Sequence, residues 1–193
     1  MSPRIGMNLE IIIDAAAELA NQEGMKGVTL STLSKKLNVR PPSLYNHVSG
    51  LQGIQVELCV SGLEQLYEQM SSSVRGLTGE KALLALANAY MEFAHSSPGL
   101  YEASLLKVSD DRTEELSDRI VQLVVQLLIQ FGYANEQTAI HAARGLRSML
   151  HGFAVLMRQH AFELSQDISE SFLFSIRAFA EGLQKACRSI SKS

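Results

Sequence analysis

Apolar residues recur along the chain at intervals of three and four, which is the spacing of one face of an α-helix. One such stripe near the end of the chain comprises Phe172, Ile176, Phe179, Leu183, Cys187 and Ile190. Glycine, serine and proline interrupt the pattern at helical intervals, and no segment shows the sustained alternation typical of a half-buried strand. The pattern predicts an all-α protein with nine helices, over about residues 7–23, 30–37, 41–48, 51–74, 79–95, 98–107, 111–131, 136–160 and 168–188.

Composition agrees with a helical globular chain. Of the 193 residues 46% are hydrophobic and 19% charged, and none of the 4 prolines follows Pro98. Ser97 before Pro98 predicts a helix N-cap. The run from Ile120 to Asn135 has no charged residue, but its 16 residues are too few for the ~20 that a membrane-spanning helix needs.

The start of the chain and its two cysteines indicate a cytoplasmic protein. The segment Leu9–Ala20 has acidic residues at a spacing of four, which predicts an amphipathic helix and argues against a signal peptide. Cys59 and Cys187 are far apart and match no metal or redox spacing, so we expect reduced, buried thiols.

Charge is distributed unevenly along the chain. The net charge is −3, which does not by itself favour nucleic-acid binding. Residues 1–50 contain five Lys/Arg and four acids, however, and no acid occurs between Lys26 and Gly50. This segment is therefore the candidate for contact with a polyanion.

Two short helices lie within that segment, TLSTLSKKLNVRPPSLYNHV from Thr29 to Val48. Helices this short are marginal alone, so packing has to hold them. Asn38 after the first helix tolerates left-handed backbone geometry, and Pro41 suits the first turn of the second. We expect the following residues to face inward: Leu33, Leu37, Val39, Leu44 and Val48. The arrangement predicts a helix-turn-helix, whose second helix enters the major groove of DNA.

The polar face of this unit carries groups suited to DNA. Arg40 can donate to guanine, Asn46 can read adenine, and Pro41 and Pro42 offer apolar surface to thymine methyl groups. The candidate phosphate contacts are Thr29, Ser31, Ser43, Tyr45 and His47. The alternative is an ordinary helical corner with a solvated face.

Over about residues 7–56 the chain resembles the TetR family of bacterial transcriptional repressors. The resemblance rests on IIIDAAAELANQEG, VTLSTLSKKLNV and PPSLYNHV, which follow the family pattern of helix, Gly, Thr, helix-turn-helix and an L-Y-x-H ending. Farther along, RSMLHGFAVL resembles the C-terminal domain type named for a Trp-His-Gly motif, with His151-Gly152 present and the tryptophan absent. The implied organisation is a DNA-binding domain over 1–50 and a helical ligand-binding and dimerisation domain over 51–193.

The resemblance also implies roles for individual residues. Thr29, Tyr45 and His47 fall on phosphate-contact positions of the family, and Arg40 with the two prolines falls on or beside the base-reading ones. Two positions depart from the pattern. Leu51 stands where the family usually has a lysine, and Arg40 where it commonly has a serine or threonine cap. Lys35, Lys36 and Arg4 are the cations available to compensate.

The C-terminal half predicts a homodimer and a ligand pocket. A single recognition helix binds weakly, so such proteins pair and read an inverted repeat. The expected interface is a four-helix arrangement built from Gly145, Ser148, Gly152, Phe172, Ile176, Phe179 and Leu183. In this family the middle helices enclose a pocket for a small-molecule inducer, with Tyr67, Tyr90, Arg147 and His151 as the candidate polar groups.

No pattern indicates catalysis, a cofactor or a metal. Glu92-Phe93-Ala94-His95 matches the Glu-x-x-His element of di-iron proteins, but that chemistry needs a second copy, and none occurs. We therefore expect a ligand-responsive repressor that is not an enzyme. The alternative is a helical ligand-binding or interaction module that has lost DNA binding.

Overall fold

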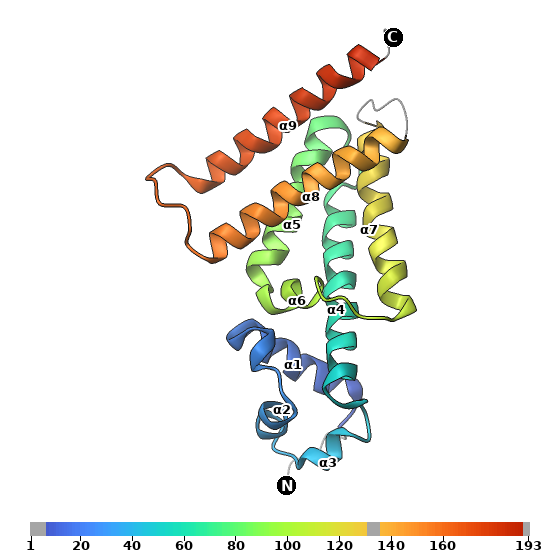
Figure 1. Cartoon of the computed structure of the whole chain (residues 1–193), viewed down its shortest axis with the longest axis vertical. Coiled ribbons are helices and arrows are strands. Elements are labelled where there is room, and N and C mark those ends of the chain that lie inside the picture. Colours follow the sequence, from blue (N-terminus) through green and yellow to red (C-terminus); the bar gives the residue numbers. More distant parts are fainter. Residues whose placement is uncertain (1–6, 131–135, 191–193) are drawn as a thin grey trace. The chain divides into compact units, whose positions relative to one another are not determined.

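The computed structural model describes residues 7–130 and 136–190, with side chains as far as Lys185. Within these ranges the chain forms nine α-helices and one 3₁₀-helix, with no strand (Figure 1). The elements are α1 (Leu9–Glu23), η1 (Met25–Gly27), α2 (Leu30–Lys36), α3 (Pro41–Leu44), α4 (Gly50–Ser73), α5 (Gly79–Ser96), α6 (Pro98–Ala103), α7 (Asp111–Gln130), α8 (Glu136–Arg158) and α9 (Ile168–Ile190). The all-α prediction is confirmed.

Two helices are shorter than the sequence predicts. The predicted helix 41–48 ends at Leu44, because the next residues tighten into turns in which His47 N–H donates to the Leu44 carbonyl at 2.9 Å. The predicted helix 98–107 ends at Ala103, where Leu105 and Leu106 make similar short-range bonds. The other helices begin and end within three residues of the predicted bounds.

The chain divides into two compact units, and the first is discontinuous in sequence. Unit 1 comprises Met1–Gln65 and Ser96–Leu116, and unit 2 comprises Leu66–His95 and Ser117–Ser193. The boundary predicted at residue 50 follows the order of the chain, whereas the packing places the start of α4 and all of α6 with α1, α2 and α3.

Close backbone packing holds α6 against α1 and α4 within unit 1. A Cβ atom on Gly99 would lie 2.2 Å from the Ala20 carbonyl carbon of α1, so only glycine fits there. The Asn21 side-chain oxygen accepts from Gly99 N–H at 2.8 Å, whereas the predicted cap Ser97 makes no side-chain cap bond. On its other side α6 meets α4, where a Cβ on Gly62 would lie 2.5 Å from the Leu100 oxygen.

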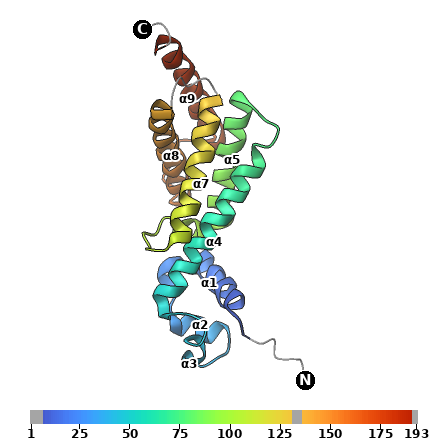
Figure 2. The same cartoon turned by 90° about the vertical axis from the view of Figure 1, so that its right-hand side faces the viewer.

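Unit 2 is a helical bundle with an apolar core. Its fully buried side chains include Leu83, Leu86, Phe93, Leu128, Leu146 and Ile176. The helices α8 and α9 lie side by side (Figure 2), and Phe153 of α8 contacts Phe172 of α9 edge-on at 5.2 Å between ring centroids. Among the described residues no helix combines the length and the apolar character that a membrane crossing requires.

Candidate nucleic-acid interface

The first short helix, α2, begins at a fully formed cap. Thr29 Oγ1 accepts from Thr32 N–H at 3.0 Å, and Thr32 Oγ1 in return accepts from Thr29 N–H at 2.9 Å. Thr32 Oγ1 also lies 2.8 Å from the Gly27 oxygen, to which it donates. The Thr29 hydroxyl therefore fixes the start of α2. The Thr29 hydroxyl also lies 3.0 Å from Thr32 Oγ1, and because the Thr32 proton goes to the Gly27 oxygen, Thr29 is the donor between the two hydroxyls.

The turn between α2 and α3 has the geometry that its sequence predicts. Asn38 adopts φ 52°, in the left-handed region that few residues other than glycine and asparagine tolerate. Arg40 takes the N-cap position of α3 without a side-chain cap bond, and Pro41 and Pro42 follow as the first two helical residues. Proline suits these positions because their N–H groups would have no helical partner.

A buried apolar base supports α3 from the inside. Leu33 and Leu44 are fully buried and Val48 nearly so, whereas Leu37 and Val39 are half-buried. A helix of four residues has little stability of its own, so these side chains hold it in place. The predicted inward set is confirmed for its three buried members.

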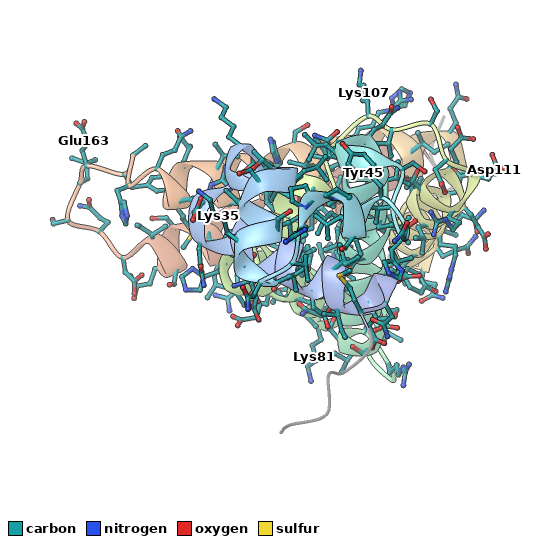
Figure 3. All side chains as sticks on the ribbon, turned by 90° about the horizontal axis from the view of Figure 1, so that it is seen from below. Lys35, Tyr45, Lys81, Lys107, Asp111 and Glu163 are labelled. Atoms are coloured by element: carbon teal, nitrogen blue, oxygen red, sulfur yellow. The ribbon has the colours of Figure 1, made fainter. Side chains whose placement is uncertain are left out.

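The predicted DNA-contacting residues lie mostly on the outer face of the same unit. Figure 3 looks onto that face, where Lys35 of α2 and Tyr45 after α3 are labelled. Tyr45 is 60% exposed. The other exposed members are Ser31, Arg40, Pro41, Pro42, Asn46 and His47, while Thr29 and Ser43 are half-buried. Seven of the nine predicted residues are therefore exposed, and the hydroxyls of the other two are partly covered.

The cations near this face are not equivalent. Lys36 Nζ lies 2.7 Å from Glu18 Oε2 of α1, so one of the cations expected to compensate for the missing lysine is held in an ion pair. Lys35 is exposed and has no ion pair within the described part of the chain. Leu51 is half-buried, and Arg4 lies outside the described residues.

The four residues predicted for a ligand pocket differ in their surroundings. Tyr90 is buried, and His151 is half-buried. The Arg119 guanidinium lies 4.2 Å above the Tyr67 ring, a cation–π contact between α7 and α4. Arg147 is exposed. The set therefore includes one side chain inside the core of unit 2 and one on its surface.

The seven residues predicted for dimerisation divide into covered and accessible ones. Phe172 and Ile176 are buried within a single chain, because α8 and its neighbours already cover that stripe of α9, so the prediction is corrected at these two positions. Gly145 and Ser148 are exposed, and Gly152, Phe179 and Leu183 are half-buried. Phe174, which the interface prediction omitted, is 74% exposed.

An ion network at the start of α7 has no counterpart in the sequence analysis. The Arg112 guanidinium donates to both Glu57 oxygens, at 2.7 and 3.1 Å, and to both Asp110 oxygens at 3.0 Å. These bonds lower the pKa of Asp110 and raise that of Arg112. Glu57 and Arg112 are 55 positions apart, so no local pattern could reveal the pair. The network fixes the end of the α6–α7 connection to α4 inside unit 1.

The cysteines and the possible metal ligands were also candidates for chemistry in the sequence. Cys59 is buried, and burial raises the pKa of its thiol, whereas the side chain of Cys187 lies outside the described residues. Over the described ranges no group of three or more His, Cys, Asp or Glu side chains comes close enough together to hold a metal ion.

Comparison with known proteins identifies both halves of the chain. Residues 12–49 match the model of the bacterial regulatory proteins of the tetR family, and residues 83–179 match that of the tetracyclin repressor-like C-terminal domain. The chain is 61% identical to the HTH-type transcriptional regulator YobS of Bacillus subtilis (strain 168), over 95% of this chain and 96% of that protein.

Solved structures show the same fold at low sequence identity. A protein of unknown function from Rhodococcus sp. RHA1 superimposes with a TM-score of 0.78 at 18% identity, covering 93% of this chain and 97% of that one. A TetR variant from Acinetobacter baumannii AYE in complex with minocycline superimposes with a TM-score of 0.69 at 20% identity, covering 93% and 98%. From its matched domains and its relative in Bacillus subtilis, the chain belongs to the TetR family of helix-turn-helix transcriptional regulators.

Proposed function

We propose that this regulator is a repressor that binds an inverted-repeat DNA operator as a homodimer and leaves it when a small-molecule inducer binds. The observation that carries the proposal is the outer face of α2 and α3. Polar donors and two proline rings are exposed there, on a buried base of Leu33, Leu44 and Val48. No acidic residue occurs between Lys26 and Gly50, so α2 and α3 themselves carry no charge that would repel DNA.

The residues around the start of α3 contact the edges of the base pairs. Arg40 has an exposed guanidinium with no ion pair in the described part of the chain, and it can donate two hydrogen bonds to guanine O6 and N7. Pro41 and Pro42 present apolar surface to thymine methyl groups, and Asn46 can bond to both edge atoms of adenine. These groups supply the sequence preference.

Phosphate contacts fix the position of α3 in the groove but carry no sequence information. The side chains in this role are Thr29, Ser31, Ser43, Tyr45 and His47. Tyr45 is the most prominent, because its hydroxyl stands at the end of a rigid, exposed ring. The two partly covered hydroxyls, on Thr29 and Ser43, reach only phosphates that approach the start of their helices closely.

Dimerisation through α8 and α9 brings two such faces to one operator. Gly145, Ser148 and Gly152 follow one line on α8, and small residues allow helices to approach closely. Phe179 and Leu183 add partly exposed apolar surface on α9. Covering these groups against a second copy is favourable, because apolar surface leaves water.

An inducer bound in unit 2 would lower DNA affinity through a different arrangement of the two reading faces. Tyr67, Tyr90, Arg147 and His151 remain the candidate polar contacts. Support comes from the solved TetR variant in complex with minocycline, which has this fold. Ligand screening by thermal shift tests this part, since a ligand at ~100 times its Kd stabilises its target by ~2.7 kcal/mol.

The decisive experiment measures binding to palindromic fragments from upstream of the regulator's own gene as a function of salt. With about four to six phosphates neutralised per dimer, log affinity should fall against log salt with a slope of about −4 to −5. A random-sequence duplex of equal length is the control. A flat or absent response would favour the other function, a ligand-binding or interaction module without DNA binding.

A further inference from the structure

The ion pair between Glu18 and Lys36 stands out from the other charges of unit 1. Four cations lie between Lys26 and Arg40, and in the described part of the chain only Lys36 is held by a carboxylate. Its partner comes from α1, outside the acid-free segment. The pair therefore removes one positive charge from the neighbourhood of the DNA-contacting face.

Lys36 is close enough to that face for its charge to matter. It is the last residue of α2, four residues before Arg40, so the chain between them spans at most ~14 Å. Rows of phosphates border the groove that α3 would enter, and duplex DNA carries a charge about every 1.7 Å along its axis. A lysine released at this point of the unit could reach a phosphate beside the base that Arg40 reads.

The pair is also open to competition. Glu18 is 64% exposed, so its carboxylate is readily hydrated when the lysine leaves. Exposed ion pairs of this kind contribute little net stability. The side chain of Lys36 is 26% exposed, so its stem lies along the protein while its ammonium can turn to another anion.

We propose that Glu18 is a specificity-determining residue that limits phosphate contacts by holding Lys36. This inference rests on the proposed DNA-binding function. Phosphate contacts strengthen binding to every sequence, whereas base contacts strengthen binding to the operator alone. A carboxylate that occupies one lysine per protomer therefore lowers the background of sequence-independent binding and leaves discrimination to Arg40 and its neighbours.

The test is binding of Glu18→Gln to a random-sequence duplex and to an operator fragment, over a series of salt concentrations. One added phosphate contact per protomer steepens the log–log salt slope by about 1.8 per dimer. If the variant and the wild type bind equally at about 1 M salt, this difference in slope makes the variant at most ~60-fold tighter at about 0.1 M salt. We expect a gain of at least about fivefold on random DNA at that salt concentration. The gain on the operator should be smaller, so that the ratio of the two affinities falls.

Two further variants separate the release of Lys36 from a change in net charge. Glu10→Gln makes the same chemical change on the same helix at an exposed residue with no ion pair among the described residues, and it should leave the salt slope unchanged. Adding Lys36→Gln to Glu18→Gln should abolish the gain. In a wild-type background Lys36→Gln should alter binding to random DNA by less than twofold.

The results distinguish a failure of the proposed function from a failure of this inference. If the wild-type protein binds no duplex in a salt-dependent manner, both the proposed function and this inference are overturned. If it binds DNA and Glu18→Gln has the wild-type slope, only this inference is overturned. An equal gain from Glu10→Gln would also overturn it, because net charge would then explain the effect. Thermal unfolding of each variant verifies that the fold is intact.

Discussion

Replacing Gly99 with alanine tests the packing of α6 against α1. The new Cβ would lie 2.2 Å from the Ala20 carbonyl carbon and 2.4 Å from the Asn21 nitrogen. Non-bonded carbons are comfortable at about 3.5–4.0 Å, so the two helices have to separate by about 1 Å or more. Both obstructing atoms belong to the backbone, so no side-chain rotation can relieve the overlap.

The expected cost follows from three contributions. Overpacking of this kind costs about 1–3 kcal/mol. Separation also strains or breaks the bond from Gly99 N–H to Asn21, which is worth about 1 kcal/mol. The better helix propensity of alanine offsets up to about 1 kcal/mol of this loss in stability. The net prediction is a loss of about 1–3 kcal/mol in the free energy of unfolding.

Urea unfolding followed by far-ultraviolet circular dichroism measures this loss. For m near 2 kcal/mol/M, the midpoint should fall by about 0.5–1.5 M. Gly182→Ala is the matched control, because its Cβ would meet no atom within 4 Å and α9 should gain up to about 1 kcal/mol. A Gly99→Ala protein as stable as the wild type would refute the packing described for α6.

Three further substitutions address DNA binding and assembly. Arg40→Ala should cost about 1–3 kcal/mol on the operator and relax preference at one base pair; equal losses on operator and random DNA in a fluorescence-anisotropy titration would contradict base reading. Tyr45→Phe should weaken binding to both duplexes alike, by about 1 kcal/mol per half-site, because it removes a phosphate contact; a loss confined to the operator would reassign Tyr45 to base reading. Gly152→Arg should convert dimers into monomers in sedimentation velocity, since no described residue outside its own helix backbone lies within 4 Å of a Cβ there. Asn88→Arg, at an exposed site on α5, should not. A Gly152→Arg dimer would place the interface elsewhere.

Local patterns in the sequence predict most of the reading face. The three-and-four spacing of apolar residues predicts the helices, and Asn38 indicates the turn, because left-handed geometry restricts the residue types that fit. The capping threonine and the prolines of α3 act within a few residues of their own positions. These features depend on the chain's own neighbourhood, so they can be recognised without coordinates.

What the sequence does not predict depends on residues that are distant along the chain. The pair Glu18 and Lys36, the network of Glu57 with Arg112, and the contact of Gly99 with Ala20 each join segments whose approach is a product of the whole fold. The burial of Phe172 and Ile176, which were predicted at a dimer interface, was missed for the same reason. Periodicity marks an apolar face, but it does not distinguish a neighbour in the same chain from one in a partner.

The packing of α6 on α1 determines which segments have to be transferred together when the DNA-binding unit is moved into another protein. A chimaera that exchanges only residues 1–50 with another family member would separate Ala20 and Asn21 from the helix that evolved to cover them. The cassette to graft is Met1–Gln65 together with Ser96–Leu116, two pieces of chain that have to be exchanged as one.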